Sequence, residues 1–213
     1  MLLLNELDEI RYGLLENEDL AEMAQVIGEV FSRSDPLGVA IGMTAEELES
    51  FVLVFGTKAV AERLTIIARG RSGELVGAMF TDDFGTPPPE LENLPGSFAP
   101  VGALLESLDE EYLHTQTIVE GSHAHLNMLA VLPTLAGKGI AQNLLKLCME
   151  NAAKRGYRFA VTEANGPISQ HIFRKLGFRE RFMVSYKDFR FNNQPIFASI
   201  ESTKGIMLME ANL

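Results

Sequence analysis

The stretch from residue 123 to 176 constrains the fold most, because strand-like and helix-like patterns alternate along it. Residues 123–132 and 157–163 are short apolar-rich runs typical of strands, whereas 140–154 and 167–176 carry apolar residues at helical spacing. A strand-helix-strand-helix order of this length indicates a βαβ unit with locally parallel strands. We therefore expect an α/β fold in this half of the chain.

Helix and strand signals also fill the first half of the chain. Asn17 is expected to cap a first helix, which Asp35-Pro36 ends. Thr44 and Glu47 form a capping box that opens a second helix running towards Glu62. Further strands are expected at residues 9–15, 64–69 and 74–81, the last two joined by a Gly-Arg-Ser-Gly turn, and at 178–191 and 206–211.

Residues 82–122 have a different character. Three consecutive prolines at 87–89 make residues 82–100 a loop, and 101–113 is expected to be a short helix. A connection of about 40 residues is unusual, and such insertions are commonly lids or binding loops, although a functionless excursion fits nearly as well. We expect one domain, residues 1–213, with a mixed central sheet of about six to seven strands flanked by helices. The insertion would lie between the third and fourth strands.

The composition argues against several classes of function. Acidic residues outnumber basic ones by 29 to 18, the net charge is −11, and no basic run exists, so a nucleic-acid partner is not expected. Cys148 is the only cysteine, which rules out an intramolecular disulfide, and its spacing to Leu144 and Leu145 indicates packing in a helix. The N-terminus lacks a signal-peptide pattern and no apolar run has membrane-spanning length. We expect a cytoplasmic protein that does not contact the membrane.

Residues 129–141 carry the most specific chemical signal. A strand ending in Leu-Ala-Val-Leu-Pro is followed by Gly137-Lys138-Gly139, and a helix begins at Ile140. Free N–H groups and the helix dipole form an anion site there, and glycine lacks a side chain that would hold a phosphate away. A Walker loop would need Ser or Thr after Lys138, and a dinucleotide fingerprint a third glycine. By itself the Gly-x-Gly pattern is weak, and a tight turn without a ligand is the better explanation of it alone.

Together with a second motif, this segment resembles the GNAT acetyltransferase superfamily. The family's phosphate motif, Gln/Arg-x-x-Gly-x-Gly/Ala, corresponds to Ala-Gly-Lys-Gly-Ile-Ala at residues 136–141. Its helix ending in Lys-Leu-Gly-Phe corresponds to Phe-Arg-Lys-Leu-Gly-Phe at 173–178. The resemblance is clear over residues 123–212, and the element order fits the remainder. It implies a GNAT fold and an N-acetyltransferase that uses acetyl-CoA.

Within the superfamily, the chain is most similar to the arylalkylamine N-acetyltransferase-like group. Ser34-Asp35-Pro36-Leu37 resembles the Asp-Glu-Pro-Leu element of insect members, and residues 125–131 resemble the His-Leu-His strand of vertebrate enzymes. Residues 186–188 and 207–209 also fit the insect pattern. The similarity implies transfer of the acetyl group to a primary amine, an arylalkylamine or a polyamine, by direct attack in a ternary complex.

Two residues depart from the family pattern. Ala136 replaces the Gln or Arg that opens the phosphate motif, so one side-chain contact to the pyrophosphate is missing, which Lys138 would partly replace. Phe173 stands where many members carry a tyrosine that protonates the departing thiolate, and phenylalanine has no proton to donate. Ser169 is the nearest alternative donor, although a helix-packing role is slightly favoured for it.

The attacking amine must be neutral, although alkylammonium groups have a pKa of about 10. The resemblance implies His125 and Asp35, ranked equally, as base or as anchors of a water chain. Asn127 replaces the family's second histidine. A half-buried strand histidine and a helix-ending turn residue are the simpler interpretations of His125 and Asp35. The resemblance also implies that a backbone N–H near Leu129 holds the acetyl carbonyl and stabilises the oxyanion.

The resemblance further implies a set of residues along the strand, the loop and the last helix that bind acetyl-CoA. They are Leu129, Ala130, Val131, Gly137, Lys138, Gly139, Ile140, Ala141, Gln142, Asn165, Phe173 and Lys175. The backbone of residues 129–131 would pair with the pantetheine arm as an added strand. No metal is expected, because His123 and His125 share a strand face without a third ligand cluster.

Two other functions fit the same residues. The acceptor amine could belong to a peptide or protein, with residues 82–122 forming a groove for it. Because Ala136 and Phe173 depart from the pattern, a non-catalytic acyl-CoA-binding module is the other alternative. A homodimer is possible, but the sequence does not determine the oligomeric state.

Overall fold

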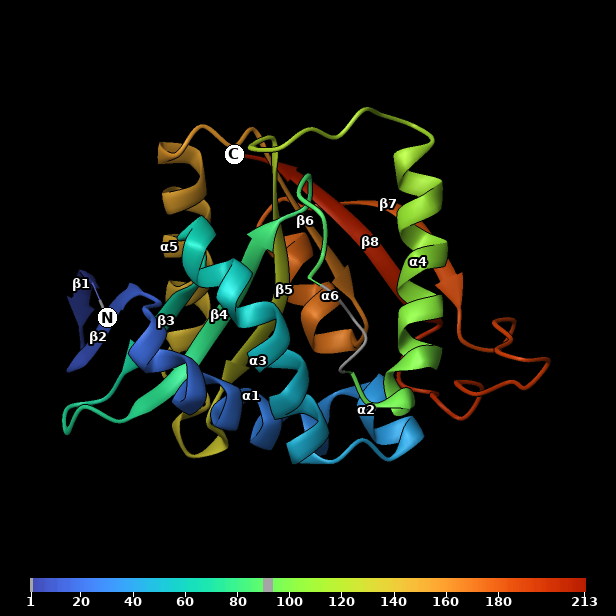
Figure 1. The fold of residues 1–213 in the computed structure, drawn as a ribbon, viewed down its shortest axis with the longest axis horizontal. Coiled ribbons are helices and arrows are strands. Elements are labelled where there is room, and N and C mark those ends of the chain that lie inside the picture. Colours follow the sequence, from blue (N-terminus) through green and yellow to red (C-terminus); the bar gives the residue numbers. More distant parts are fainter. Residues whose placement is uncertain (1, 90–93) are drawn as a thin grey trace.

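One twisted sheet with helices on both faces accounts for most of the chain (Figure 1). The structure is a computed structural model that describes residues 2–89 and 94–213. Among these residues, eight strands pair in the order β1-β2-β3-β4-β5-β6-β8-β7. Only β5 and β6 are parallel; every other neighbouring pair is antiparallel. The strands are β1 (Leu2–Leu7), β2 (Ile10–Leu14), β3 (Ile66–Arg69), β4 (Leu75–Asp83), β5 (His123–Val131), β6 (Phe159–Ala164), β7 (Arg179–Ser185) and β8 (Gly205–Asn212).

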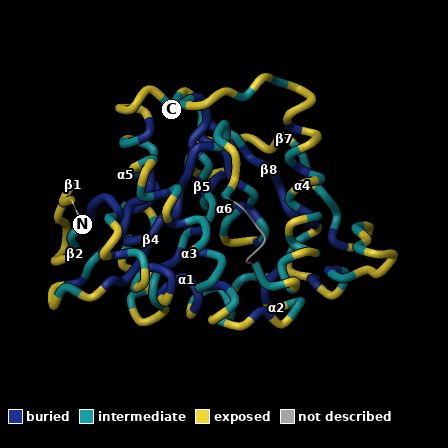
Figure 2. Tube along the Cα trace, in the orientation of Figure 1, coloured by how far each residue is buried: buried dark blue, intermediate teal, exposed yellow. Residues whose placement is uncertain are grey.

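The helices divide the core between the two faces of the sheet. The α-helices are α1 (Leu20–Ser34), α2 (Pro36–Ile41), α3 (Ala45–Glu62), α4 (Ala99–Leu113), α5 (Ile140–Lys154) and α6 (Pro167–Lys175), and the short 3-10 helices are Asn17–Asp19, Gly96–Phe98 and Pro133–Leu135. Helices α5 and α6 share one apolar cluster with the sheet, α1 and α3 share a second, and α2 and α4 contribute to a third against β6 and β8. Figure 2 shows the buried strands between these layers.

Several predicted elements have their expected bounds for the expected reasons. The capping box of Thr44 and Glu47 forms at the start of α3, which ends at Glu62. Helix α1 ends at Ser34, where Asp35-Pro36 begins α2 instead of a loop. Helix α5 spans residues 140–154 as predicted, and Gly177, at φ +87°, follows α6. The mixed α/β sheet flanked by helices is therefore confirmed.

The structure differs from the prediction in three places. The described sheet has eight strands instead of six or seven, because β1 was not expected; all six of its residues are exposed, so it has no apolar alternation to detect. The insertion consequently lies between the fourth and fifth strands. The strand expected at 178–191 ends at Ser185. Asn17 lies within a 3-10 turn whose N-cap is Glu16 rather than itself capping α1.

The sheet separates between β5 and β6, and this split positions the site described below. The two parallel strands pair only from His123–Phe159 to His125–Val161. Beyond that point Asn127 forms a bulge against β4, where Phe80 pairs with Met128 and Thr81 with Leu126. The Thr162 hydroxyl still reaches the Leu126 carbonyl oxygen at 2.8 Å. Residues 127–131 of β5 therefore pair with β4 alone and leave their other edge open.

None of the helices in the described part of the chain combines the length and the apolar character needed to span a membrane.

Candidate functional site

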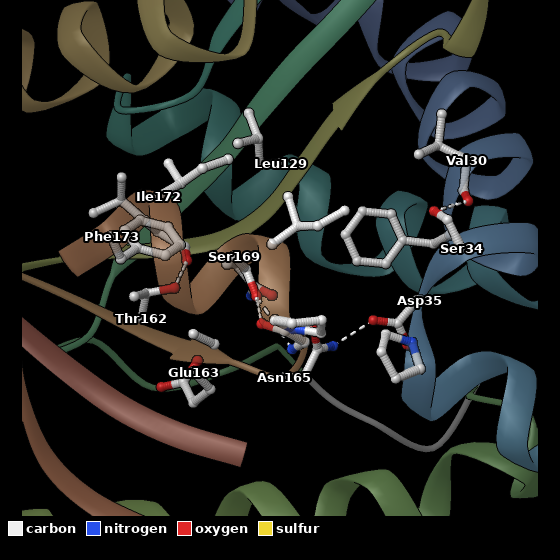
Figure 3. A pocket seen from close by; sticks show the side chains of 18 of the residues that line it. Val30, Ser34, Asp35, Leu129, Thr162, Glu163, Asn165, Ser169, Ile172 and Phe173 are labelled. Atoms are coloured by element: carbon white, nitrogen blue, oxygen red, sulfur yellow. Dashed lines mark hydrogen bonds between the residues drawn. The ribbon is translucent and has the colours of Figure 1, made fainter. Parts of the chain in front are cut away.

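A cavity of about 240 Å³ lies where β5 and β6 diverge. Figure 3 shows its lining from three directions: β5 along the upper part of the view, the junction of α1 and α2 on the right, and α6 on the left. The lining residues are mostly apolar, with a few polar groups among them. They are Val30, Phe31, Ser34, Asp35, Pro36, Met79, Leu126, Asn127, Leu129, Thr162, Glu163, Ala164, Asn165, Gly166, Pro167, Ile168, Ser169, Ile172 and Phe173.

Asp35 is the acid at the α1–α2 side of this cavity. Its Oδ2 accepts a hydrogen bond from the backbone N–H of Gly38 at 2.7 Å, which caps α2, and its Oδ1 accepts from the Asn165 side-chain amide. Burial raises the pKa of Asp35 above its ordinary value, although these hydrogen bonds act in the opposite direction. A carboxylate with a raised pKa accepts a proton more readily than an exposed one.

Asn165 links Asp35 to the end of β6. The Tyr186 hydroxyl donates to the backbone carbonyl of Asn165 at 2.6 Å, while the Asn165 side chain donates to Asp35. Burial, followed by the nearby charge of Asp35, raises the pKa of Tyr186, so this hydroxyl keeps its proton. Figure 3 shows Asn165 between the Asp35 side chain and the α6 residues.

His125 lies behind the cavity, with carboxylates at both of its ring nitrogens. Nε2 lies 2.7 Å from Glu163 Oε2, and Nδ1 forms an ion pair at 3.1 Å with Asp82 Oδ1. Burial acts to lower the pKa of His125, but the charges of Glu163 and Asp82 raise it well above the ordinary value of 6.5. The imidazole is therefore a buried cation at neutral pH, and it is absent from the cavity lining.

The charged groups around His125 continue into the helices that cover the sheet. On the α3 side, Lys58 donates to Asp82 at 2.7 Å and to Glu62 at 3.3 Å. Burial acts to raise the pKa of Asp82, but His125 and Lys58 hold it below the usual value. On the insertion side, the charge of Glu163 acts on Asp109, a half-buried residue of α4. Burial, and then the charge of Glu163, raise the pKa of Asp109 to about 7.

Ser169 and Phe173 lie on the α6 wall. The Ser169 hydroxyl donates to the Gly166 carbonyl at 3.0 Å and accepts from the Gly166 N–H at 3.2 Å, so it closes the first turn of α6. Phe173 is buried against Phe178, with ring centroids 4.9 Å apart. Both side chains line the cavity, but only Ser169 has a hydroxyl group that could donate a proton.

A second cavity, of about 280 Å³, lies at the start of α5 and shares Ile172 with the first. Gly137 and Gly139 bend the loop with φ of +77° and +75°. Within the described residues, the N–H groups of residues 137–142 have no hydrogen-bond acceptor, and the first amide of α5 to bond is Asn143, to the Gly139 carbonyl. Backbone N–H groups left free at the start of a helix can donate hydrogen bonds to an anion.

Nine of the twelve predicted coenzyme residues line one of the two cavities. Val131, Gly137, Gly139, Ile140, Ala141 and Gln142 line the second cavity, and Leu129, Asn165 and Phe173 line the first. Ala130 is buried under α1 and α3. Lys138 and Lys175 are exposed and line neither cavity. Of the predicted catalytic residues, Asp35, Asn127 and Ser169 line the first cavity, whereas His125 does not.

The sequence prediction missed Glu163, Asp82 and Asp109. Asp82 of β4 and Glu163 of β6 pair with the two ring nitrogens of His125, and the charges of His125 and Glu163 act on Asp109 of α4. Asp82 belongs to an unusual Asp-Asp pair at the end of a strand, and Glu163 interrupts an apolar strand. Both acids could be recognised in the sequence as polar residues at the ends of expected strands.

Across residues 2–89 and 94–213, no group of three or more His, Cys, Asp and Glu side chains is arranged to hold a metal ion.

Comparison with known proteins gives one family and several related folds. Residues 46–178 match the model of the Acetyltransferase (GNAT) family. The C-terminal condensation domain of Ebony, solved in complex with β-alanyl-dopamine, superposes with a TM-score of 0.88 at 11% identity, over 96% of this chain and 99% of that one.

Two further solved structures have similar coverage. Arylalkylamine N-acetyltransferase 2 from Aedes aegypti has a TM-score of 0.81 at 20% identity, over 96% of this chain and 99% of that chain. The Drosophila melanogaster polyamine N-acetyltransferase, which catalyses formation of N-acetylagmatine, has a TM-score of 0.79 at 14% identity, over 96% and 100%. At these identities, the likeness shows a common fold.

Proposed function

Because the chain belongs to the acetyltransferase (GNAT) family, we propose that this N-acetyltransferase transfers the acetyl group of acetyl-CoA to the primary amine of a small molecule, an arylalkylamine or a polyamine. The observation that carries the proposal is the pair of cavities that share Ile172. One lies beside six N–H groups that have no acceptor among residues 2–89 and 94–213, and the other reaches the acid Asp35. An anionic carrier and an amine can therefore meet at the split in the sheet.

The loop at residues 137–142 fits the diphosphate of acetyl-CoA. In the part of the chain that the structure describes, no atom lies within 4 Å of the position a Cβ on Gly137 would take, so a phosphate can approach the backbone closely. Ala136 supplies no charge, and the helix dipole of α5 and the backbone amides would hold the phosphates. Acetyl-CoA would supply a thioester, whose acetyl carbon bonds to the amine nitrogen as the carbon–sulfur bond breaks.

The open edge of β5 fits the rest of the carrier. Residues 127–131 pair with no described strand on the side of β6, so the pantetheine amides can pair with this edge as an additional strand. A backbone N–H near Leu129, which lines the first cavity, would donate to the acetyl oxygen where negative charge develops.

We assign proton acceptance to Asp35 rather than to His125. Asp35 lines the cavity, and burial raises its pKa, so its carboxylate can take the proton that the ammonium must lose before the nitrogen attacks. His125 is already protonated at neutral pH and both of its nitrogens face carboxylates. Its role is to position Glu163 and Asp82.

The leaving thiolate needs little help from the protein. A thiol of pKa about 8.5 is a far better leaving group than an alkoxide. Phe173 offers no proton, and the Ser169 hydroxyl is already bonded to the Gly166 carbonyl. Protonation of the thiolate from water is therefore sufficient.

The shape of the first cavity supports a small amine with an apolar body. Phe31, Leu126 and Ile172 line it together with Asp35. Two proteins of the same fold point to this chemistry: the Ebony domain was solved with β-alanyl-dopamine, an N-acylated arylalkylamine, and the Drosophila enzyme forms N-acetylagmatine.

A thiol-release assay tests the proposal. Purified protein with acetyl-CoA is incubated with tryptamine, dopamine, agmatine, putrescine or an N-terminal peptide, and the acetylated products are identified by mass spectrometry. Turnover of at least one small amine, with a higher kcat/KM than the peptide, is the expected result. Calorimetric binding of acetyl-CoA without turnover of any amine would contradict it and favour a non-catalytic binding role.

A further inference from the structure

Two walls of the first cavity meet at two consecutive pairs of residues. Asp35 and Pro36 lie at the junction of α1 and α2, and Asn165 and Gly166 connect β6 to α6. The Asn165 side-chain amide donates to Asp35 Oδ1, as the dashed line in Figure 3 shows. One residue further along, a Cβ on Gly166 would lie only 3.2 Å from Pro36 Cγ. One polar and one apolar contact therefore join the walls.

The Asp35 carboxylate receives one hydrogen bond on each oxygen. The Gly38 N–H donates to Oδ2 at 2.7 Å, and Asn165 donates to Oδ1. Gly38 belongs to α2, so its bond ties the carboxylate only to the helix that Asp35 itself caps. The bond from Asn165 comes from the opposite wall. A carboxylate has about four lone-pair sites, so two donors fix its orientation and leave sites for a substrate proton.

The backbone of Asn165 is held by a third part of the chain. The Tyr186 hydroxyl donates to the Asn165 carbonyl at 2.6 Å, and Tyr186 is fully buried directly after β7. Burial, and then the charge of Asp35, raise the pKa of Tyr186, so this donor keeps its proton wherever a carboxylate titrates. The Asn165 amide is therefore presented to Asp35 from a fixed backbone.

An amide at this position acts on the charge of the neighbouring acid. Burial raises the pKa of Asp35, whereas the hydrogen bonds from Gly38 and Asn165 act to lower it. The amide neither gains nor loses a proton near neutral pH, so it donates at every pH of interest. Glu163, the other acid in the cavity lining, is bonded to His125 instead. Asn165 thus helps Asp35 to be ionised when the amine arrives.

We propose that Asn165 is a positioning residue of the transfer reaction, which holds the Asp35 carboxylate in one orientation from the opposite wall of the cavity. The proposal deepens the proposed function and rests on it for the role of Asp35 as base. It gives Asn165 a role other than the contact with acetyl-CoA expected from the sequence, because its amide nitrogen already donates to Asp35.

Asn165→Ala removes the donor and leaves the backbone carbonyl for Tyr186. We expect kcat to fall roughly tenfold at neutral pH, about the factor for one hydrogen bond to a charged group, with KM for acetyl-CoA unchanged. Loss of the donor raises the pKa of Asp35 further, so the acidic limb of the kcat profile should move to higher pH. Steady-state kinetics from acidic to alkaline pH measure both effects.

Asn165→Asp separates hydrogen-bond donation from packing, because the two side chains have nearly the same shape. Two carboxylates in contact cannot both ionise easily, and the pKa of one of them rises strongly. This variant should therefore be more impaired than Asn165→Ala, with its acidic limb displaced further. If Asn165 only filled space, Asn165→Asp would be the milder change, and that result would overturn the proposal. Thermal melting identifies any variant that has lost its fold.

Asn151→Ala is the matched control. Asn151 also donates one side-chain hydrogen bond, to the Arg63 carbonyl at 2.9 Å, and it lines neither cavity. Its replacement should leave kcat and the pH profile unchanged. A higher KM for acetyl-CoA in Asn165→Ala, without a change in the pH profile, would assign Asn165 to the coenzyme and overturn the proposal.

A titration without turnover separates this proposal from the proposed function. Carboxyl-carbon NMR of the protein without substrates reports the pKa of Asp35, and Asp35→Asn identifies its signal. We expect a higher pKa for Asp35 in Asn165→Ala than in the wild type. If this shift occurs but the wild type acetylates no amine, the proposed function fails while Asn165 still positions Asp35. An unchanged Asp35 pKa overturns the positioning role whatever the activity.

Discussion

At the scale of single residues, burial decides which titratable groups can take part in proton transfer. Asp35 and His125 were equal candidates in the sequence, and the structure gives them different surroundings. Asp35 borders the cavity with a raised pKa, whereas His125 is enclosed by two acids and carries its proton at neutral pH. Residue type alone could not separate them.

Removal of the Asp35 carboxylate should impair the chemical step. We expect Asp35→Asn to lower kcat about a hundredfold or more, since a positioned base contributes on that order. Because the amine must then lose its proton to water, activity of the variant should rise continuously with pH towards the amine's own pKa. Steady-state kinetics from neutral to alkaline pH would check this. Asp188→Asn, at an exposed position, is the control; a wild-type pH profile in Asp35→Asn would contradict the assignment.

Replacement of His125 should affect stability, in a pH-dependent way. His125→Gln leaves Asp82 and Glu163 without their cation, and loss of one partner of a buried ion pair costs about 3–5 kcal/mol. The native pKa of His125 is raised, so its contribution is complete below the unfolded value of 6.5 and is lost as the pH rises through the native pKa.

Urea denaturation at several pH values measures this effect. The difference in unfolding free energy between wild type and His125→Gln should be largest below pH 6.5, the unfolded value, and should narrow as the pH rises into the alkaline range. His114→Gln, at an exposed histidine, should show neither effect. A difference that grows with pH would contradict the buried imidazolium.

The residues that meet at the site illustrate what a sequence can reveal. Asp35 and Asn127 were predicted from a family pattern and Ser169 as the nearest donor to replace the missing tyrosine, and all three line one cavity. Glu163 was missed because its significance depends on a contact with His125, 38 residues away along the chain. Such pairings follow from strand register, which no local pattern encodes.

At the scale of elements, the loop before α5 should control affinity for the donor. Gly137 has φ +77°, where an alanine costs about 1–2 kcal/mol, and the added Cβ would lie in the open space in front of the loop. We expect Gly137→Ala to raise KM for acetyl-CoA about tenfold with a smaller change in kcat. This follows because phosphate contacts form before the chemical step.

Gly121→Ala is a close control for this variant. Gly121 has the same φ of +77°, and again no atom of the described residues lies within 4 Å of the Cβ position. The two variants should lose similar stability by thermal melting. A rise in KM for acetyl-CoA in both would attribute the effect to general strain and not to the anion site.

Elements were predictable where local chemistry sets their ends. The Thr44–Glu47 capping box and the glycine turn before Ile140 fixed the starts of α3 and α5. The exposed strand β1 was not predictable, because it is held by backbone pairing with β2 and buries no side chain of its own. Pairing of this kind depends on the partner strand and leaves no periodicity in the sequence.

At the scale of the whole molecule, the two cavities allow both substrates to be bound at once. We therefore expect sequential kinetics, with initial-rate lines for the two substrates that intersect, and no acetylated protein in mass spectra of the enzyme with acetyl-CoA alone. Cys148 cannot carry the acetyl group, because burial raises its pKa to about 12 and its side chain is fully covered. Parallel lines, or a protein one acetyl group heavier, would contradict direct transfer.

The short pairing between β5 and β6 has a further consequence for thermal stability. Only three residue pairs join the two parts of the sheet there, and a carrier lying along the open edge of β5 would bridge the gap that follows. Bound acetyl-CoA would then add contacts between the two parts of the sheet, β1–β5 and β6–β8, where the strands themselves do not pair. A molecule that binds only the folded form stabilises it in proportion to the logarithm of its concentration. The melting temperature of the protein should therefore rise with the concentration of acetyl-CoA.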